Sequence, residues 1–180
     1  MDTYKVKWTQ LQSEIFRLLC IKAGEELNQR TMAKMLNVTA TTIANALPSL
    51  EKEGLISREQ YKKMNLNIIK LKRTQKAMQL KRVENLKMIY ETELAEFLIH
   101  HHPGTAIVLF GSYSRGDDIT ASDIDIAVIG MKEIDLDPAP YEKKLERTIS
   151  MHYLVSLKEV STEFRENLCN GIVLHGGIEL

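Results

Sequence analysis

Residues 109–130 read LFGSYSRGDDITASDIDIAVIG, and this stretch decides the fold of the second half of the chain. It joins two short apolar runs that predict buried strands. Gly111 and Ser112 follow the first run directly, and Asp123 and Asp125 open the second. Residues two apart on a strand point to the same face, so both carboxylates are expected on one side of a sheet. The spacing therefore predicts a glycine turn and a pair of carboxylates carried by two strands.

This pairing suits a nucleotide and a divalent cation. A glycine has no side chain to keep a phosphate away from the backbone, and a strand-to-helix turn offers amide donors to an anion. Arg115 adds a fixed positive charge with forked donors. Asp123 and Asp125 would repel each other unless a cation lay between them, and oxygen ligands of this kind suit Mg²⁺. The alternative is a surface loop followed by an acidic turn, without a ligand.

The stretch strongly resembles the nucleotidyltransferase superfamily of DNA polymerase beta, and in particular its minimal branch. The resemblance extends over about residues 84–178. The positions that match the Gly-Ser and Asp-x-Asp motifs, and then their surroundings, are Gly111, Ser112, Asp123, Asp125, Arg115, Gly116 and Ser122. The resemblance implies that Asp123 and Asp125 are catalytic and hold Mg²⁺, with Gly111, Ser112, Arg115 and Ser122 on the nucleotide. It also implies transfer of a nucleotide, AMP from ATP, to a hydroxyl acceptor.

The family's third carboxylate, on a later strand, has no obvious counterpart here. The expected strand at residues 147–154 reads RTISMHYL and contains no Asp or Glu. Ser150 or His152 stands at the corresponding position. His152 could replace the carboxylate as a base, since histidine titrates near neutrality, or it could have a purely structural role. Three roles therefore stay open: a transferase, a catalytically inactive nucleotide-sensing protein, and an antitoxin-like protein, since the minimal branch often pairs with a helical partner protein.

The first half of the chain has the pattern of three short helices and a β-hairpin. Helices are expected over 11–21, after Asn28 and from about Ala40 to Gly54, and the hairpin strands over 55–60 and 64–71. This arrangement, and the segment LNQRTMAKMLNVTATTIANALPSLEKEGLISRE in particular, resembles the winged helix-turn-helix family over about residues 8–72. The resemblance implies binding to duplex DNA.

The residues of this half suit a DNA surface. The start of a recognition helix meets base edges and needs small polar side chains, whereas basic residues contact phosphates without reading sequence. The candidates are Thr39, Thr41, Thr42 and Asn45 for bases, and Arg30, Arg58, Lys62 and Lys63 for phosphates. The alternatives are that Thr39 only caps the helix, that the lysines only solvate the wing, and that the domain docks a protein.

One long connecting helix is expected over residues 76–102. Its first turns are basic and its later turns are acidic, and its apolar residues recur at three- and four-residue steps. It could carry a homodimer contact or simply pack on its own domain. The run His100-His101-His102 closes it, and three adjacent histidines on a helix point too far apart to share one metal ion.

Charge and composition agree with two units of different function. Residues 1–82 carry 16 basic and 7 acidic side chains, whereas residues 83–180 carry 8 and 17, so a net charge of zero conceals +9 and −9. A chance division of surface charge is the alternative. The fold class predicted is mixed α+β, with a winged helix over 1–75 and a small mixed sheet with flanking helices over 76–180. Two lone cysteines amid apolar neighbours, and no membrane span or signal peptide, predict buried thiols in a cytoplasmic protein.

Overall fold

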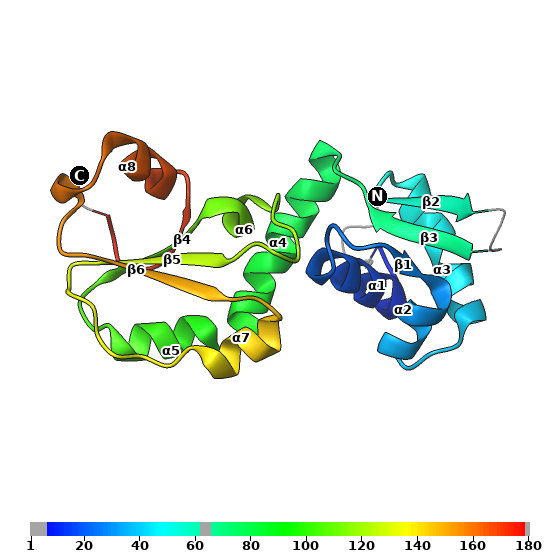
Figure 1. The fold of residues 1–180 in the computed structure, drawn as a ribbon, viewed down its shortest axis with the longest axis horizontal. Helices are drawn as coiled ribbons and strands as arrows, with labels where there is room; N and C mark the ends of the chain where they lie inside the picture. The colour runs from blue at the N-terminus through cyan, green and yellow to red at the C-terminus, as the bar shows by residue number, and fades with distance from the viewer. Residues whose placement is uncertain (1–6, 62–65, 179–180) are drawn as a thin grey trace. The chain divides into compact units, whose positions relative to one another are not determined.

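The chain folds into two compact units, Met1–Ala77 and Met78–Leu180. The computed structural model describes residues 7–61 and 66–178, and its elements are labelled in Figure 1. The predicted mixed α+β class is confirmed, with a three-stranded sheet in the first unit and a four-stranded sheet in the second. No helix of the described ranges is long and apolar enough to cross a membrane.

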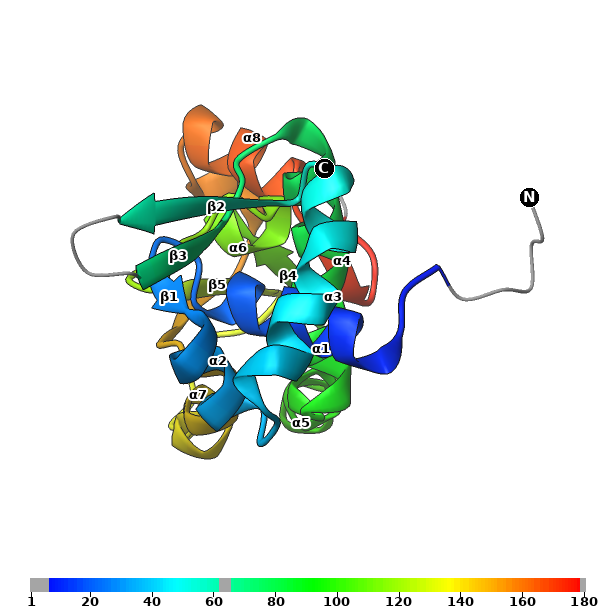
Figure 2. The ribbon, with the colours of Figure 1, turned by 90° about the vertical axis from the view of Figure 1, so that its right-hand side faces the viewer.

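The first unit has the helices and hairpin that the sequence predicts (Figure 2). Its elements are α1 (Gln10–Ile21), β1 (Leu27–Asn28), α2 (Gln29–Met35), α3 (Ala40–Lys52), β2 (Ile56–Tyr61) and β3 (Leu66–Leu71). The strands lie in the order β1-β3-β2 and are antiparallel. Each helix begins at a polar cap, because a side-chain oxygen there accepts a free backbone N–H. The caps are Thr9, Asn28 and Thr39.

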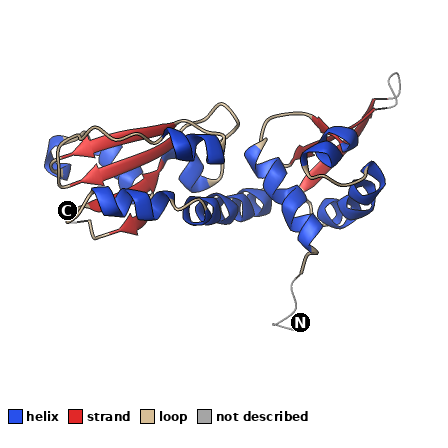
Figure 3. Cartoon of the chain, turned by 90° about the horizontal axis from the view of Figure 1, so that it is seen from below, coloured by secondary structure: helices blue, strands red, loops and turns tan. Residues whose placement is uncertain are grey.

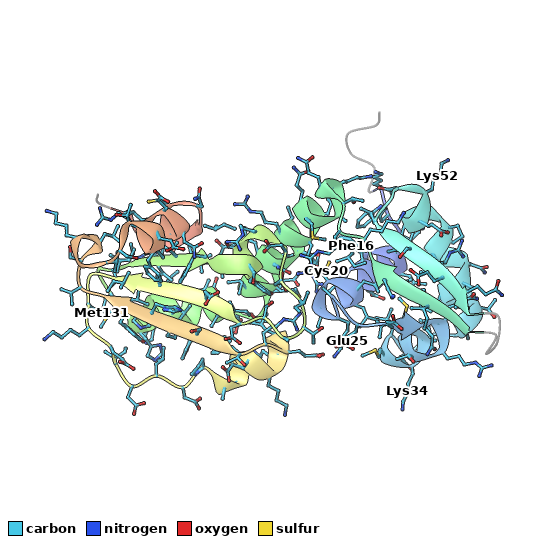
Figure 4. All side chains as sticks on the ribbon, turned by 45° about the horizontal axis from the view of Figure 1, so that its top comes forward. Phe16, Cys20, Glu25, Lys34, Lys52 and Met131 are labelled. Carbon is cyan, nitrogen blue, oxygen red and sulfur yellow. The ribbon has the colours of Figure 1, made fainter. Side chains whose placement is uncertain are left out.

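The core of this unit follows the apolar spacing of its helices. Phe16 and Cys20 on α1 are buried, whereas Lys34 and Lys52, at the ends of α2 and α3, project away from the ribbon (Figure 4). The apolar spacing of the helix after Asn28 predicts that Met35 is buried, and this was wrong, since Met35 is 45% exposed. Helix α2 has only seven residues, about two turns, and its buried side is formed by Met32 and Ala33.

The second unit is a mixed sheet with helices around it (Figure 3). Its elements are α4 (Gln75–Glu91, which begins in the first unit), α5 (Leu94–His101), β4 (Ala106–Phe110), α6 (Gly111–Arg115), β5 (Ile124–Ile129), α7 (Ala139–Leu145), β6 (Ile149–Leu154), the 3₁₀ turn η1 (Leu157–Glu159), α8 (Thr162–Cys169) and β7 (Ile172–His175). The strand order is β6-β5-β4-β7. Only the β5–β6 pair is parallel.

The sheet is covered on both faces. Helix α8 and η1 lie over one face, and α5 and α7 over the other (Figure 1). Val108, Phe110 and Ala127 point to the first face and form a core with Leu157 and Leu168. Asp125 is paired in register with Phe110, the last residue of β4, so its side chain emerges on this same face, near the start of β5. Burial of the sheet thus fixes which face carries the predicted carboxylates.

The expectation of one connecting helix over residues 76–102 was wrong. The helix ends at Glu91, and a second begins at Leu94. Glu93 between them has φ +66°, a left-handed conformation that no continuous helix contains. The Thr92 hydroxyl donates to Met88 O at 2.7 Å and so satisfies a carbonyl at the helix end. The sequence has no glycine or proline at this break. Because the apolar periodicity continues on both sides of it, the pattern predicted a single helix.

The two cysteines differ in their surroundings. Cys20 is buried and Cys169 is exposed, and no disulfide joins them. The prediction of a buried thiol was therefore wrong for Cys169, which is the last residue of α8. Leu168, beside it, takes the buried position against the sheet.

Candidate functional site

The Gly111 turn leaves β4 at the edge where β5 begins. Gly111 has φ +71°, and a methyl group placed on it would collide with Asp125 Oδ2. Glycine is required here both for the backbone conformation and for this close approach. The Ser114 hydroxyl donates to Gly111 O at 2.9 Å and closes the first turn of α6. The turn therefore lies directly against the side chain of the second predicted aspartate.

The two aspartates lie at the start of β5. Asp125 is the second residue of the strand, and its side chain is 29% exposed. Asp123 precedes the strand by one residue and is exposed. Both carboxylates therefore remain accessible to a ligand in solution, while Gly111 confines one side of Asp125.

Strand β6 brings Ser150 and His152 to the same place. Ser150 is the register partner of Asp125, and His152 follows two residues later on the same face. His152 Nε2 lies 3.5 Å from Asp125 Oδ1 and 3.2 Å from Ser150 Oγ. The imidazole also packs edge-on against Phe110, with ring centroids 5.1 Å apart. His152, on the strand β6 that contains no carboxylate, therefore contacts Asp125, one of the two predicted metal ligands.

Arg115 and Ser122 occupy the rim of this region. Arg115 is exposed, and its guanidinium lies 3.4 Å from both Asp117 Oδ2 and Asn167 Oδ1. These long contacts leave the guanidinium near the surface. The Ser122 hydroxyl accepts from Ile119 N at 3.0 Å, so it shapes the loop that leads to Asp123. The Ser122 side chain is thus occupied locally.

A buried polar cluster behind the turn was missed by the sequence analysis. Lys81 and Asn85 on α4 contact Asp118, which follows α6, and the Arg147 guanidinium lies 3.7 Å from Asp118 Oδ2. All four residues are buried. The sequence analysis counted Lys81 only among the basic residues of the first turns of the connecting helix. One signal in the sequence could have found them. Lys81 and Asn85 lie between Ala77 and Ile89 at four-residue spacing, and residues at this spacing share one side of a helix, which in α4 is buried.

The predicted base-reading residues lie on α3. Thr41, Thr42 and Asn45 are exposed. Thr39 is the cap, and its hydroxyl accepts from Thr42 N at 3.1 Å. Thr39 therefore has the structural role that the sequence left open, and the hydroxyls of Thr39 and Thr42 lie 2.7 Å apart.

The predicted phosphate contacts are only partly placed. Arg30 is exposed on α2. The Nε of Arg58 donates to Glu51 at 2.7 Å, so part of its charge is neutralised within the unit. Lys62 and Lys63 lie outside the described residues. Of the two candidate arginines, both in the described part of the chain, Arg58 pairs with Glu51, and the structure gives no ion pair for Arg30.

A strong hydrogen-bond network lies at the end of α3. Glu53, the C-cap, accepts from Lys7, Trp8 and Lys76. Burial by itself would raise the pKa of Glu53, but these hydrogen bonds outweigh it and lower the pKa to about 2. The carboxylate is therefore ionised across the physiological range, and it ties α3 to both ends of the first unit.

His102, the last residue of the histidine run, makes hydrogen bonds within the fold. His102 is buried, with Nδ1 2.7 Å from Leu98 O and Nε2 3.1 Å from the Tyr153 hydroxyl. Burial, and then the charge of Glu133, raise the pKa of Tyr153. Both ring nitrogens of His102 thus serve the fold.

Across residues 7–61 and 66–178, no group of three or more His, Cys, Asp or Glu side chains is arranged to hold a metal ion. Mg²⁺ is usually bound through one or two carboxylates together with substrate phosphates and water, not by a complete protein cage. Two accessible carboxylates beside a glycine turn fit that donor set, so the residues present suit Mg²⁺ delivered with a nucleotide.

The fold and motifs define a class: a winged helix joined to a nucleotidyltransferase-type mixed sheet. Comparison with known families agrees for both parts. Residues 92–177 match the model of the polymerase beta nucleotidyltransferase family, and residues 12–63 match that of the MarR family. The predicted recognition of both families is thus confirmed. No curated protein matches the chain.

The solved structures that resemble this chain include MepR and ZitR. MepR of Staphylococcus aureus, a transcription regulator of the multidrug efflux pump MepA, is 25% identical, with a TM-score of 0.40 over 53% of this chain and 66% of that one. MepR in complex with DNA is 28% identical, with a TM-score of 0.39 over 52% and 74%. ZitR of Lactococcus lactis is 19% identical, with a TM-score of 0.42 over 54% and 64%. This chain therefore spans just under two thirds of the length of the first of these regulators.

Proposed function

We propose that this protein is a DNA-binding transcription regulator whose second domain binds Mg²⁺-ATP and transfers AMP to a hydroxyl acceptor. We assign DNA binding to residues 1–75 and nucleotide chemistry to residues 76–180. The observation that carries the nucleotide part is the contact of Gly111 with Asp125, which sets a glycine turn against an accessible pair of carboxylates. The match of residues 92–177 to nucleotidyltransferases supports it.

Each site residue has a defined task in this proposal. Asp123 and Asp125 would hold Mg²⁺ through carboxylate oxygens. The amides of the Gly111–Ser112 turn and the guanidinium of Arg115 would hold phosphate oxygens. The acceptor oxygen would bond to the α-phosphorus of ATP as the bond to the leaving pyrophosphate breaks, and Mg²⁺ would offset the negative charge that develops on the phosphates. The chain's own residues thus position the phosphates and the acceptor, which is the main source of catalysis in reactions of this kind.

Calorimetry of Mg²⁺-ATP with the full chain tests the nucleotide part. Wild type should bind ATP only when Mg²⁺ is present. Asp123→Ala and Asp125→Ala should each abolish this binding, because one carboxylate alone holds the cation weakly. Glu163→Ala, an exposed carboxylate on α8, is the matched control and should bind as wild type does. Unchanged affinity in either aspartate variant would refute the site.

The DNA part rests on the exposed start of α3. Thr41 and Asn45 lie on its solvent side, four residues apart, as base contacts from a recognition helix require. The match of residues 12–63 to the MarR family supports this assignment. Among similar proteins, MepR has been solved with DNA.

Salt titration of DNA binding tests this part. The full chain should bind duplex DNA with an affinity that falls steeply as salt rises, because basic residues that contact phosphates release counterions. Arg30→Ala should weaken binding to all sequences alike and reduce the salt slope by about 1. Affinity that is absent at low salt, or flat across salt, would contradict DNA binding.

A second candidate function, nucleotide sensing without transfer, is favoured by strand β6. This strand has Ser150 and His152 where the family places a carboxylate, so an acceptor hydroxyl meets no carboxylate base there. General-base assistance is typically worth about 10²–10⁴-fold in rate. In this form the protein would bind Mg²⁺-ATP and report it to a partner, which includes an antitoxin-like role with a helical protein.

His152 variants separate the two functions in a transfer assay with labelled ATP. If His152 is the base, His152→Ala abolishes a real activity. If its role is structural, His152→Ala lowers stability alone, and His152→Asp raises transfer by restoring the family pattern. Robust wild-type transfer that survives His152→Ala would show that neither His152 nor the absent carboxylate limits the reaction.

The outer face of α4 supports a homodimer or a helical partner. Val83 is 63% exposed and Tyr90 is 43% exposed, seven residues apart and so on one side of the helix. Glu91 at the end of the helix pairs with Lys87 at 3.4 Å within the chain, so the proposed contact rests on the exposed apolar side chains. Val83→Asp should convert a dimer to monomer in sedimentation velocity, with Gln79→Asp as the control.

A further inference from the structure

Helix α4 contacts α6, the helix that the Gly111–Ser112 turn opens. Yet α4 precedes the segment that matches the nucleotidyltransferase family, which begins at residue 92. The Lys81 ammonium donates to Asp118 O at 3.1 Å and to Asp118 Oδ1. The Asn85 amide donates to Tyr113 O at 2.9 Å and to Asp118 Oδ1 at 2.8 Å. Two side chains of α4 thus hold both α6 and Asp118, in the loop that follows α6.

The backbone of α4 makes a third contact. Gly116, the C-cap of α6, has φ +80°, and a methyl group there would collide with Met78 O and Arg82 N. Only glycine permits this approach. Asn85 contacts Tyr113, which lies before Gly116 in the chain, and Lys81 contacts Asp118, which lies two residues after it. The helix, the turn and the loop after it are therefore packed without room for independent movement.

The charges of this cluster favour a single arrangement. The side chains of Lys81 and Asp118 are 0% exposed, and that of Arg147 is 1% exposed. A buried charge is costly unless it keeps its partner, so Asp118 cannot move away from Lys81 without leaving uncompensated charge. Asp118 lies on the only chain connection between Ser112 and Asp123, five residues before Asp123. Its position therefore constrains both predicted halves of the site.

We propose that Lys81 and Asn85 are positioning residues for the nucleotide site. They hold Asp118 so that the Gly111–Ser112 turn and Asp123 keep the spacing that Mg²⁺-ATP needs. The inference rests on the proposed nucleotide binding and deepens it, because it extends the functional unit to a helix outside the family segment. These residues touch neither metal nor nucleotide and act through Asp118.

Lys81→Met is the substitution that tests the proposal. Lys81 and Arg147 are positive and Asp118 is negative, so the cluster carries a net charge of +1, and removing Lys81 brings it to zero. Arg147 still compensates Asp118, and methionine fills much of the lysine volume, so the variant is expected to fold. Outer-shell partners of a metal site typically contribute about 10–100-fold to affinity. Calorimetry should therefore show the Kd for Mg²⁺-ATP raised by about tenfold or more.

Two controls separate positioning from a general loss of stability. Met88→Ala removes a buried side chain from the same face of α4 and should lower the melting temperature while leaving the Kd unchanged. Lys87→Met makes the same chemical change at an exposed position and should alter neither. If Met88→Ala weakens nucleotide binding as much as Lys81→Met does, the cluster acts through stability alone and the proposal is wrong.

Hydrogen exchange of the ligand-free protein gives a readout that needs no nucleotide. Lys81→Met should speed exchange of the amides from Gly111 to Ser122 and leave those of β4 unchanged. If wild type fails to bind Mg²⁺-ATP, the proposed nucleotide function fails, and exchange alone then decides whether Lys81 holds the turn. Unchanged exchange in a folded Lys81→Met protein, or a Kd within about twofold of wild type, overturns the proposal.

Discussion

The two candidate binding surfaces are built in opposite ways. On α3, Thr41 and Asn45 project into solvent from a helix whose other side is core. At the nucleotide turn, Gly111 lies against Asp125, and Asp118 behind it is wholly buried. The first surface is therefore a set of side chains displayed on a stable helix. The second is a backbone shape held by buried contacts, so its substitutions should affect binding and stability together.

The largest expected effect is that of Asp118→Ala. This change leaves Lys81 and Arg147 buried without their carboxylate, and breaking a buried pair in this way costs about 3–5 kcal/mol. Urea denaturation should show that loss in the second unit. Asp117→Ala, at the neighbouring and more exposed carboxylate, should cost well under about 1 kcal/mol. Equal effects of the two changes would mean that burial of the cluster does not matter.

Gly111→Ala should have the next largest effect. The left-handed backbone costs a non-glycine residue about 1–2 kcal/mol, and the new methyl group must also displace Asp125. We expect a loss of about 1–3 kcal/mol in stability together with the loss of Mg²⁺-ATP binding. Gly177→Ala, where a methyl group meets no atom, serves as the control. A Gly111→Ala protein that binds Mg²⁺-ATP normally would contradict the tight turn.

The pH dependence of stability tests whether the hydrogen bonds of Glu53, the C-cap of α3, stabilise the first unit. Its pKa is lowered to about 2, so its contribution is present above the ordinary value of 4.5 and is lost as pH falls from 4.5 towards 2. Solvent screens the half-exposed Lys7 and Lys76, so we expect on the order of 1–2 kcal/mol. Glu53→Gln should remove this loss between pH 5 and 2, as followed by thermal unfolding. A wild type and variant with parallel pH profiles would rule out the network as the cause.

The smallest effect on stability is expected for Asn45→Ala. Asn45 is exposed, so the free energy of unfolding should change by no more than about 0.5 kcal/mol. If Asn45 reads a base, the variant should lose about 1–3 kcal/mol of discrimination at one base pair. Competition binding with substituted DNA duplexes measures this loss. Uniform weakening across all sequences would assign Asn45 to the DNA backbone instead.

Local features were determined by the sequence alone. The caps Asn28 and Thr39 and the strands on either side of Gly111 follow from short-range rules, because their causes lie within a few residues. The spacing of Asp123 and Asp125 predicts a common face, and the structure places Asp125 on β5 with Asp123 one residue before the strand. The family resemblance indicated Ser150 or His152 as the counterpart of the third carboxylate, but only the parallel pairing of β5 with β6 in the structure brings His152 to Asp125.

Only the tertiary structure decided the features that join distant residues. Lys81 meets Asp118 across 37 positions, and the exposed-looking lysine is buried because the fold supplies its carboxylate. The break at Glu93 and the pairing of Arg58 with Glu51 also depend on neighbours that periodicity does not contain. A sequence pattern records what each residue prefers in water. Burial of a charge depends instead on a partner, and the partner is placed only when the whole chain has folded.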